Sequence, residues 1–249
     1  MAARAELAPW PELKVSWKIA LGDPFFTGLS LTGRTLRFMT LNTLPPQALA
    51  GRPAAVLWLV RHGQSTWNVL GLVQGHCDQA RLTARGAHQA RDVANQLRGC
   101  PIGALYASDL QRAVATAAPL APVLGLSVTR DRRLRERSLG ALEGTASAAV
   151  PPALSGVAGN RVIDPDARPP DGESIRDLYW RVAAFADDVL SPENAPLGEV
   201  AVVAHGGTLR VLTAYLRGVP VERMSWEPVA NGSVVRLSPR QLRRFTRKE

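Results

Sequence analysis

The chain has 249 residues, of which 46% are apolar and 20% are charged. This ordinary globular composition excludes a wholly disordered chain, a collagen and a coiled coil. No stretch approaches the ~18 uninterrupted apolar residues of a membrane-spanning helix, and the first 30 residues lack the compact apolar segment of a secretory signal. The two cysteines, Cys77 and Cys100, cannot form a disulfide framework or a four-ligand zinc site. We therefore expect a cytoplasmic protein of one or two domains.

A net charge of +9 raises the question of a nucleic-acid partner. However, only three of the 30 basic residues are lysines, and the chain is also rich in Ala, Gly and Pro, a bias that GC-rich coding alone produces. The basic residues are scattered, with two local concentrations, Arg130, Arg132, Arg133, Arg135 and Arg137, and Arg240, Arg243, Arg244, Arg247 and Lys248. We interpret the charge as a solvated basic surface that is compatible with an anionic substrate. We expect no nucleic-acid and no membrane partner.

Residues 1–53 differ from the rest of the chain and contain six prolines. Within them, apolar residues alternate with other residues over 13–21, which predicts a half-buried strand. Leu29, Leu31, Leu36 and Phe38 flank a Thr-Gly pair, which predicts a hairpin. We treat 1–53 as an N-terminal extension. It is a small β appendage, a poorly ordered segment, or sequence translated from a start codon assigned too far upstream, and the sequence does not separate these three interpretations.

From residue 54 onward, apolar strands alternate with amphipathic helices. We expect strands at 54–60, 104–107, 127–130, 199–204, 233–237 and 242–246, and helices at 83–97, 110–124, 173–190 and 208–216. Pro119 and Pro122 should kink or shorten the second helix. Residues 145–172 show little periodicity, which predicts a long loop or a mobile insertion. This order predicts one domain over 54–249, a three-layer α/β/α sandwich with a mostly parallel central sheet.

Polar residues stand where three of the predicted strands end. Arg61-His62-Gly63 follows the first strand, Ser108-Asp109 follows the second with Arg112 one turn further on, and His205-Gly206-Gly207 follows the strand at 199–204. In open α/β sheets, ligands bind at the carboxyl ends of the strands. Two His and two Arg should therefore face one crevice, where arginine forks suit a phosphoryl group.

The same residues fall in ordered blocks that resemble the histidine phosphatase superfamily, which includes the phosphoglycerate mutases. The resemblance covers roughly residues 55–237, and its first block is Arg61-His62-Gly63-Gln64-Ser65-Thr66-Trp67-Asn68. The later blocks are Gly75 to Asp78, Leu82 to Gly86, Ser108 to Ala113 with Thr116, Leu134 to Glu136 with Gly140, Glu143 and Gly144, Pro170 to Ser174, and His205 to Gly207. The resemblance implies a phosphoglycerate mutase-like fold and catalysis without a metal or other cofactor.

Carried over to this chain, the resemblance implies a role for each motif residue. His62 would be the nucleophile that forms a phosphohistidine, and the nearby arginines would disfavour its imidazolium form. Glu136 would protonate the leaving oxygen and then activate water. Arg61, Arg112 and His205 would hold the phosphoryl oxygens. The further substrate contacts would come from Asn68, Gln74, Gly75 and Gly206.

Three departures from the mutase pattern favour a phosphatase. Mutases typically have Glu-Arg-His-Tyr-Gly around the acid, an Asn two residues after the second His, and a substrate-anchoring Lys further along. This chain has Ser138 and Leu139 in the first motif, Gly207 in place of the Asn, and Ser147 near the Lys position. We expect a phosphomonoesterase that acts on a small phosphorylated metabolite, with a homodimer left open. The alternatives are a phosphoglycerate mutase and a non-catalytic phosphate-ligand binding protein.

Overall fold

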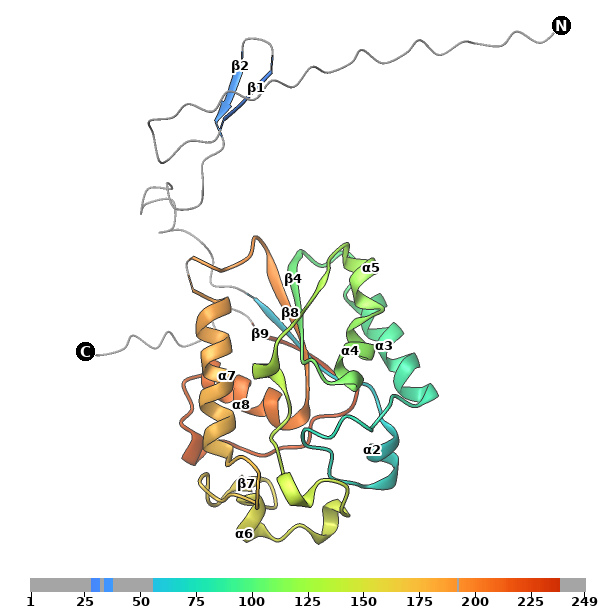
Figure 1. Cartoon of the computed structure of the whole chain (residues 1–249), viewed down its shortest axis with the longest axis vertical. Helices are drawn as coiled ribbons and strands as arrows, with labels where there is room; N and C mark the ends of the chain where they lie inside the picture. The colour runs from blue at the N-terminus through green and yellow to red at the C-terminus, as the bar shows by residue number, and fades with distance from the viewer. Residues whose placement is uncertain (1–27, 32–33, 38–55, 192, 238–249) are drawn as a thin grey trace, which may run out of the picture. The chain divides into compact units, whose positions relative to one another are not determined.

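A computed structural model of the chain describes residues 28–31, 34–37, 56–191 and 193–237 (Figure 1). The chain divides into two units, Met1–Arg52 and Pro53–Glu249. In the first unit, strands β1 (Gly28–Leu31) and β2 (Arg34–Arg37) pair antiparallel, which confirms the predicted hairpin. The strands predicted at 13–21 and 242–246 lie outside the described residues. The interpretation of 1–53 as an extension stays a prediction.

The second unit is built on a five-stranded sheet with the order β5-β4-β8-β3-β9. Its strands are β3 (Leu57–Arg61), β4 (Ile102–Ala107), β5 (Val128–Arg130), β8 (Glu199–Ala204) and β9 (Val234–Leu237). Strands β3, β4, β5 and β8 run parallel, and only the edge strand β9 pairs antiparallel. The predicted mostly parallel sheet is confirmed. Its three central strands place the carboxyl ends of β4, β8 and β3 side by side.

Helices cover both faces of this sheet, which confirms the three-layer sandwich (Figure 1). On one face lie α3 (Ala84–Gln96), α4 (Gln111–Ala117) and α5 (Leu120–Leu124), and on the other lie α7 (Ile175–Val189) and α8 (Gly206–Leu216). Alternate residues of β8 supply the two cores, because successive side chains of a strand point to opposite faces. Val202 packs with α7 and α8, whereas Val203 packs with α3 and α4.

Local sequence signals set the helix boundaries. The Thr83 side chain accepts a hydrogen bond from the Gly86 N–H and so caps α3, and Ser174 forms a capping box with Asp177 at the start of α7. The helix predicted at 110–124 is two helices, because Pro119 interrupts the chain between α4 and α5. The last helix begins at Gly206, two residues earlier than predicted. No helix of the described part is both long and apolar enough to cross a membrane.

Residues 145–172 were predicted as a long loop or a mobile insertion. A long loop without regular structure is wrong. The segment contains α6 (Pro152–Ser155) and a small antiparallel pair, β6 (Val157–Ala158) and β7 (Arg161–Val162). The remaining short elements of the second unit are α2 (Thr66–Leu70) and 3-10 turns at Arg132–Leu134, Gly140–Leu142, Ser147–Ala149 and Val221–Arg223. Elements this short have no periodicity that a sequence window can detect.

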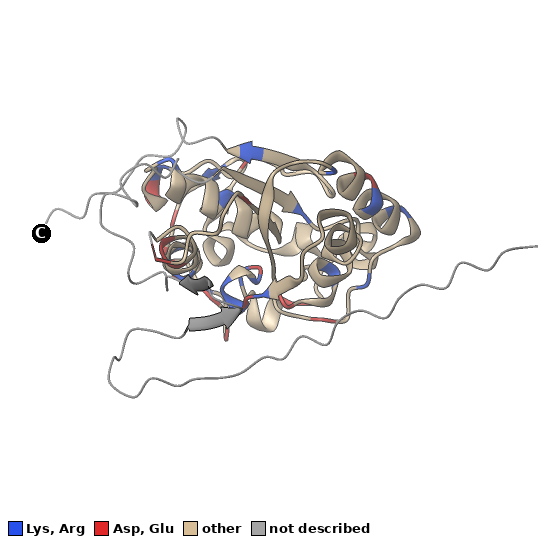
Figure 2. Cartoon of the chain, turned by 90° about the horizontal axis from the view of Figure 1, so that it is seen from above, with Lys and Arg blue, Asp and Glu red and all other residues tan. Residues whose placement is uncertain are grey.

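The first arginine concentration predicted from the sequence is not an open basic patch. Arg133 pairs with Asp131 at 2.6 Å and with Asp188 at 2.9 Å, and Arg135 pairs with Asp109 at 2.6 Å. Arg137 is buried. Figure 2 shows basic and acidic residues interspersed over the described elements. The second concentration lies outside the described residues.

Candidate active site

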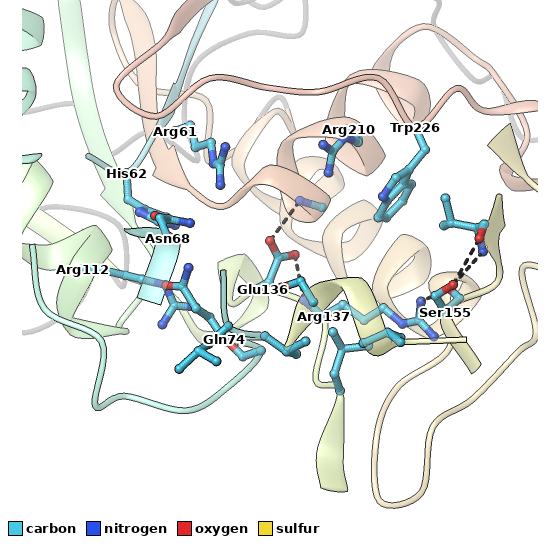
Figure 3. A pocket seen from close by; sticks show the side chains of 18 of the residues that line it. Arg61, His62, Asn68, Gln74, Arg112, Glu136, Arg137, Ser155, Arg210 and Trp226 are labelled. Carbon is cyan, nitrogen blue, oxygen red and sulfur yellow. Dashed lines mark hydrogen bonds between the residues drawn. The ribbon is translucent and has the colours of Figure 1, made fainter. Parts of the chain in front are cut away.

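A pocket of about 420 Å³ opens at the carboxyl end of β3 (Figure 3). Arg61 and His62 line it from the end of that strand, Arg112 from α4, Glu136 from the loop after β5, and Gly207 from the first turn of α8. The residues that follow four parallel strands, β3, β4, β5 and β8, thus meet at one place, as expected for this kind of sheet. A pocket of this size suits a small metabolite.

His62 is fixed in one ring orientation. Its backbone N–H donates to the Ala204 carbonyl of the neighbouring strand at 2.9 Å, and its backbone carbonyl accepts from the Asn231 side-chain amide at 3.1 Å. The ring Nδ1 lies 2.8 Å from the Gly63 carbonyl oxygen. Because a carbonyl only accepts, Nδ1 carries the proton, and the lone pair is on Nε2. This tautomer leaves Nε2 available as a nucleophile.

The surroundings of both histidines favour the neutral imidazole. Burial lowers the pKa of His62 well below 6.5, and the positive charges of Arg112 and Arg61 lower it further. His205 is fully buried, and burial together with Arg112 lowers its pKa in the same direction. The two rings meet edge to face with their centroids 5.1 Å apart. His205 is not among the residues that line the pocket.

The two arginines predicted at the site each keep an unpartnered nitrogen. Arg112 is only 1% exposed and donates to the carbonyls of Cys77 at 3.0 Å and Gly75 at 2.8 Å. Arg61 donates to the Val229 carbonyl. Within the described part of the chain, the buried Nε of each arginine has no hydrogen-bond partner, and neither does any ring nitrogen of His205. Buried donors without partners are rare in folded proteins. These unpartnered nitrogens of Arg61, Arg112 and His205 are suited to bind an anion.

Glu136 lies opposite these groups with both carboxylate oxygens held by backbone. Its Oε1 accepts from the Arg137 N–H at 2.9 Å and its Oε2 accepts from the Gly207 N–H at 3.0 Å. Its backbone carbonyl accepts from His76 Nε2 at 2.8 Å and from the Arg181 guanidinium at 3.1 Å. Side chain and backbone are therefore both fixed, and the carboxylate faces the pocket as the one acidic group of its lining.

The residues predicted as substrate contacts lie around the same pocket, with one exception. Asn68 and Gln74 line it, and their side-chain oxygens are engaged by Asn231 at 3.1 Å and by the Ser65 hydroxyl at 2.9 Å. Gly75 also lines it, and its carbonyl anchors Arg112. Gly206 does not line the pocket, whereas the next residue does. Because α8 begins at Gly206, the N–H of the following Gly207 is the one that donates to Glu136. The substrate contact predicted for Gly206 stays a prediction.

Four residues whose contacts shape the site were not predicted, namely Arg137, Arg210, Trp226 and Asn231. Arg210 and Trp226 line the pocket beyond Glu136, and Asn231 holds both His62 and Asn68. The one available signal was Arg210, a charged residue within an otherwise apolar helix. Trp226 and Asn231 lie in a loop whose sequence carries no periodic pattern. Arg137 is next to the predicted acid but has a separate role.

The Arg137 guanidinium fastens residues 145–172 to the site. It is 4% exposed and donates only to backbone carbonyls, namely those of Leu154 at 3.2 Å, Ala167 at 2.8 Å, Glu173 at 2.7 Å and Ser155. Burial lowers its pKa to about 10. The insertion is thus attached to the residue that follows Glu136 in the chain.

Arg137→Met should lower the free energy of unfolding by at least about 2 kcal/mol, because four backbone carbonyls, three of them partly buried and that of Ala167 fully buried, lose their donor. Urea denaturation measures this. Arg168→Met is the matched control in the same segment: Arg168 pairs with Asp177 at 2.6 Å but is half exposed, and we expect a change below about 1 kcal/mol. An Arg137→Met variant as stable as the unsubstituted protein would show that desolvation of the guanidinium outweighs its hydrogen bonds.

Comparison with known proteins assigns the family. The model of the histidine phosphatase superfamily (branch 1) matches residues 57–247. A protein of Hydrogenobacter thermophilus named as a phosphoserine phosphatase is 36% identical over 169 residues, which are 68% of this chain and 81% of the relative. A protein of Enterobacter sp. named as phosphoglycerate mutase GpmB is 39% identical over 167 residues, 66% of this chain and 75% of the relative.

Solved structures give the same result. A mycobacterial glucosyl-3-phosphoglycerate phosphatase complexed with VO3 superposes with a TM-score of 0.64 at 32% identity, over 74% of this chain and 91% of the other. Bacillus stearothermophilus YhfR has a TM-score of 0.64 at 28% identity, over 74% of this chain and 90% of the other. The residues matched by the family model, 57–247, include those that line the pocket. The chain belongs to the histidine phosphatase superfamily, branch 1.

Proposed function

We propose that this chain is a phosphomonoesterase that hydrolyses a small phosphorylated metabolite through a phosphohistidine at His62, without a metal. The observation that carries the proposal is the neutral His62 imidazole with its lone pair on Nε2, beside Arg61 and Arg112 with unpartnered buried nitrogens and opposite Glu136. The arginines supply the positive charge that a dianionic phosphoryl group requires. We propose the cytoplasm as the location, with no nucleic-acid or membrane partner.

The proposed reaction has two steps. In the first, the His62 Nε2 lone pair forms a bond to phosphorus, the P–O ester bond breaks, and Glu136 gives its proton to the departing oxygen. In the second, the Glu136 carboxylate takes a proton from water, the water oxygen bonds to phosphorus, and the P–N bond breaks with its electrons returning to Nε2. Inorganic phosphate and the original Glu136 carboxyl result. Arg61 and Arg112, which line the pocket, act in both steps as donors to the phosphoryl oxygens. We propose His205 as a further donor, because its buried ring nitrogens have no partner among the described residues.

The mutase alternative is supported by the relative named as phosphoglycerate mutase GpmB. The local structure favours hydrolysis. A Cβ at position 207, where mutases typically have Asn, would lie 2.3 Å from Glu136 Oε1. Ser147, near the typical Lys position, lines the pocket with a neutral side chain. Interconversion of 2- and 3-phosphoglycerate, measured beside phosphate release, separates the two activities.

Rapid acid and alkaline quenching of the enzyme during hydrolysis of p-nitrophenyl phosphate tests the proposal, with excess chelator present throughout. We expect a phosphoenzyme that is stable in alkali and labile in acid, as the P–N bond of a phosphohistidine is, at up to one equivalent per chain. A phosphoenzyme with the opposite lability, or turnover that stops with chelator, would overturn the proposed mechanism. Binding of the ester without turnover in a folded protein would favour the non-catalytic alternative.

Gly207→Ala tests the close approach of α8 to the acid. The new Cβ would stand 2.3 Å from Glu136 Oε1, a distance that real Cβ contacts do not show, so the carboxylate must move. We expect kcat to fall by about 100-fold, on the scale of a misplaced catalytic group. In a Glu136→Ala background the same substitution should have little further effect, because its clash partner is gone. Equal losses in both backgrounds, measured by steady-state kinetics, would contradict the argument.

A further inference from the structure

Arg210 brings a further positive charge to the pocket that the proposed reaction does not use. It lies on α8 beside Trp226 at the edge of the pocket beyond Glu136 (Figure 3). Its guanidinium carbon is 4.9 Å from the centroid of the Trp226 ring, and its Nε donates to the Glu227 carbonyl. No carboxylate of the described residues forms an ion pair with it. The stacking and the hydrogen bond fix this side chain in place and leave its terminal nitrogens available.

Arg210 lies near the phosphoryl-binding arginines. The point where a Cβ of Gly206 would sit is 3.3 Å from Arg210 Nη1 and 3.5 Å from Arg61 Nε. The nearby charges that act on Arg210 are the repulsive one of Arg61 and the attractive ones of Glu136 and Glu227. Two guanidinium groups so placed repel each other unless an anion lies between or beside them. Glu136 alone does not neutralise these two guanidinium groups, so the pocket favours a ligand that carries negative charge.

The arginines of the pocket differ in the donors they can offer to a ligand. Arg137 lines the pocket, but each nitrogen of its guanidinium donates to a backbone carbonyl. Arg61 and Arg112 are the proposed partners of the phosphoryl group. Arg210 remains, with its terminal nitrogens available to one further anionic group of the substrate, and a single carboxylate matches one guanidinium.

The insertion contributes to the wall next to Arg210. The Trp226 backbone N–H donates to the Asn160 carbonyl at 2.8 Å, and the Asn160 side chain donates to Glu227 at 2.9 Å. Val157 and Gly159 of the insertion line this side of the pocket together with Trp226. These three residues are neutral, so Arg210 carries the charge on this side of the pocket lining.

On the basis of the proposed phosphatase function, we propose that Arg210, held by Trp226, is a subsite for a carboxylate on the leaving group. The favoured substrates are then small phosphomonoesters that carry a carboxylate within a few bonds of the ester oxygen. Arg210 contacts the substrate, and Trp226 positions the guanidinium. A planar guanidinium suits this task because its two terminal nitrogens match the two carboxylate oxygens.

Matched pairs of esters test the subsite. 3-Phosphoglycerate is compared with glycerol 3-phosphate, and O-phospho-L-serine with O-phosphoethanolamine, since each pair differs in the carboxylate. We expect kcat/KM to favour the carboxylate of each pair by about 10- to 100-fold, and Arg210→Gln to remove that preference while changing the other ester less than about 3-fold. Arg210→Lys should keep part of the preference, and Trp226→Leu should weaken it. Arg217→Gln is the control, because Arg217 is exposed at the end of the same helix and outside the pocket.

Other outcomes overturn the subsite. An equal loss on both members of each pair would mean that Arg210 acts on the transferred phosphoryl group. An Arg210-dependent preference for fructose 1,6-bisphosphate over fructose 6-phosphate would assign the subsite to a second phosphate. Calorimetric binding of the same pairs to His62→Ala keeps the test separate from the proposed function, because a carboxylate preference that depends on Arg210 should persist there without turnover. Equal affinities for both members in that variant would contradict the subsite even if the enzyme is a phosphatase.

Discussion

His62→Ala is expected to abolish hydrolysis of a chromogenic phosphomonoester, with a loss of about 10⁴-fold or more in kcat, the scale seen when a covalent nucleophile is removed. The reason is the tautomer. Nδ1 donates to the Gly63 carbonyl, so Nε2 is the nitrogen with the lone pair, and burial with Arg112 and Arg61 keeps the ring neutral. The assay contains excess chelator, and circular dichroism checks that the variant is folded.

His88→Ala is the matched control for this substitution. His88 is exposed on α3, where its ring pairs with Asp92 at 2.8 Å and lies outside the pocket. We expect unchanged turnover. Hydrolysis that survives in folded His62→Ala would show direct attack by water without a phosphohistidine. Turnover of the unsubstituted protein that is lost to the chelator would show a metal requirement.

Much of the placement of these residues is predictable from the sequence, because it follows from chain direction in a parallel sheet. The strands before His62 and His205 are continuous apolar runs, and both end where the polar residues begin. Adjacent parallel strands then bring those ends together. Arg112 was predicted in the same way and lies in the first turn of α4. The start of α3 was predicted at Thr83, a residue type that commonly caps helices, and Thr83 is its N-cap. The helix predicted from 173 begins at Ile175, after the capping Ser174.

The parts that the sequence did not predict depend on contacts between distant segments. Asn231 reaches back from the loop before β9 to His62 and Asn68. Trp226 faces the pocket because its loop pairs with Asn160 of the insertion. Nothing in a local window distinguishes these loop residues from neighbours that face solvent. Arg210 differs in that the sequence places a charged residue within a predicted apolar helix. Its contact with Trp226 could not be predicted.

Glu136→Gln should divide the reaction into its two steps. Gln has nearly the same shape as Glu and keeps one oxygen that can accept from the Gly207 N–H, 3.0 Å in the structure, while the hydrogen bond from the Arg137 N–H is lost. Gln cannot give up or take a proton. p-Nitrophenolate leaves without protonation, so the first step should proceed, whereas activation of water in the second step should not. We expect a burst of about one equivalent of nitrophenolate, followed by turnover slowed by about 10²- to 10⁴-fold.

An alkyl phosphate should behave differently in the same variant. Its leaving oxygen needs the proton that Glu136 supplies, so the first step also slows, and neither a burst nor a phosphoenzyme should accumulate. Glu199→Gln is the control, because Glu199 stands at the amino end of β8, away from the pocket, and pairs with Arg236 at 2.7 Å. Equal slowing of both esters without a burst would show that Glu136 acts only by holding the site together. Unchanged turnover would assign the acid and base to another group, and the proton transfers proposed here would then be wrong.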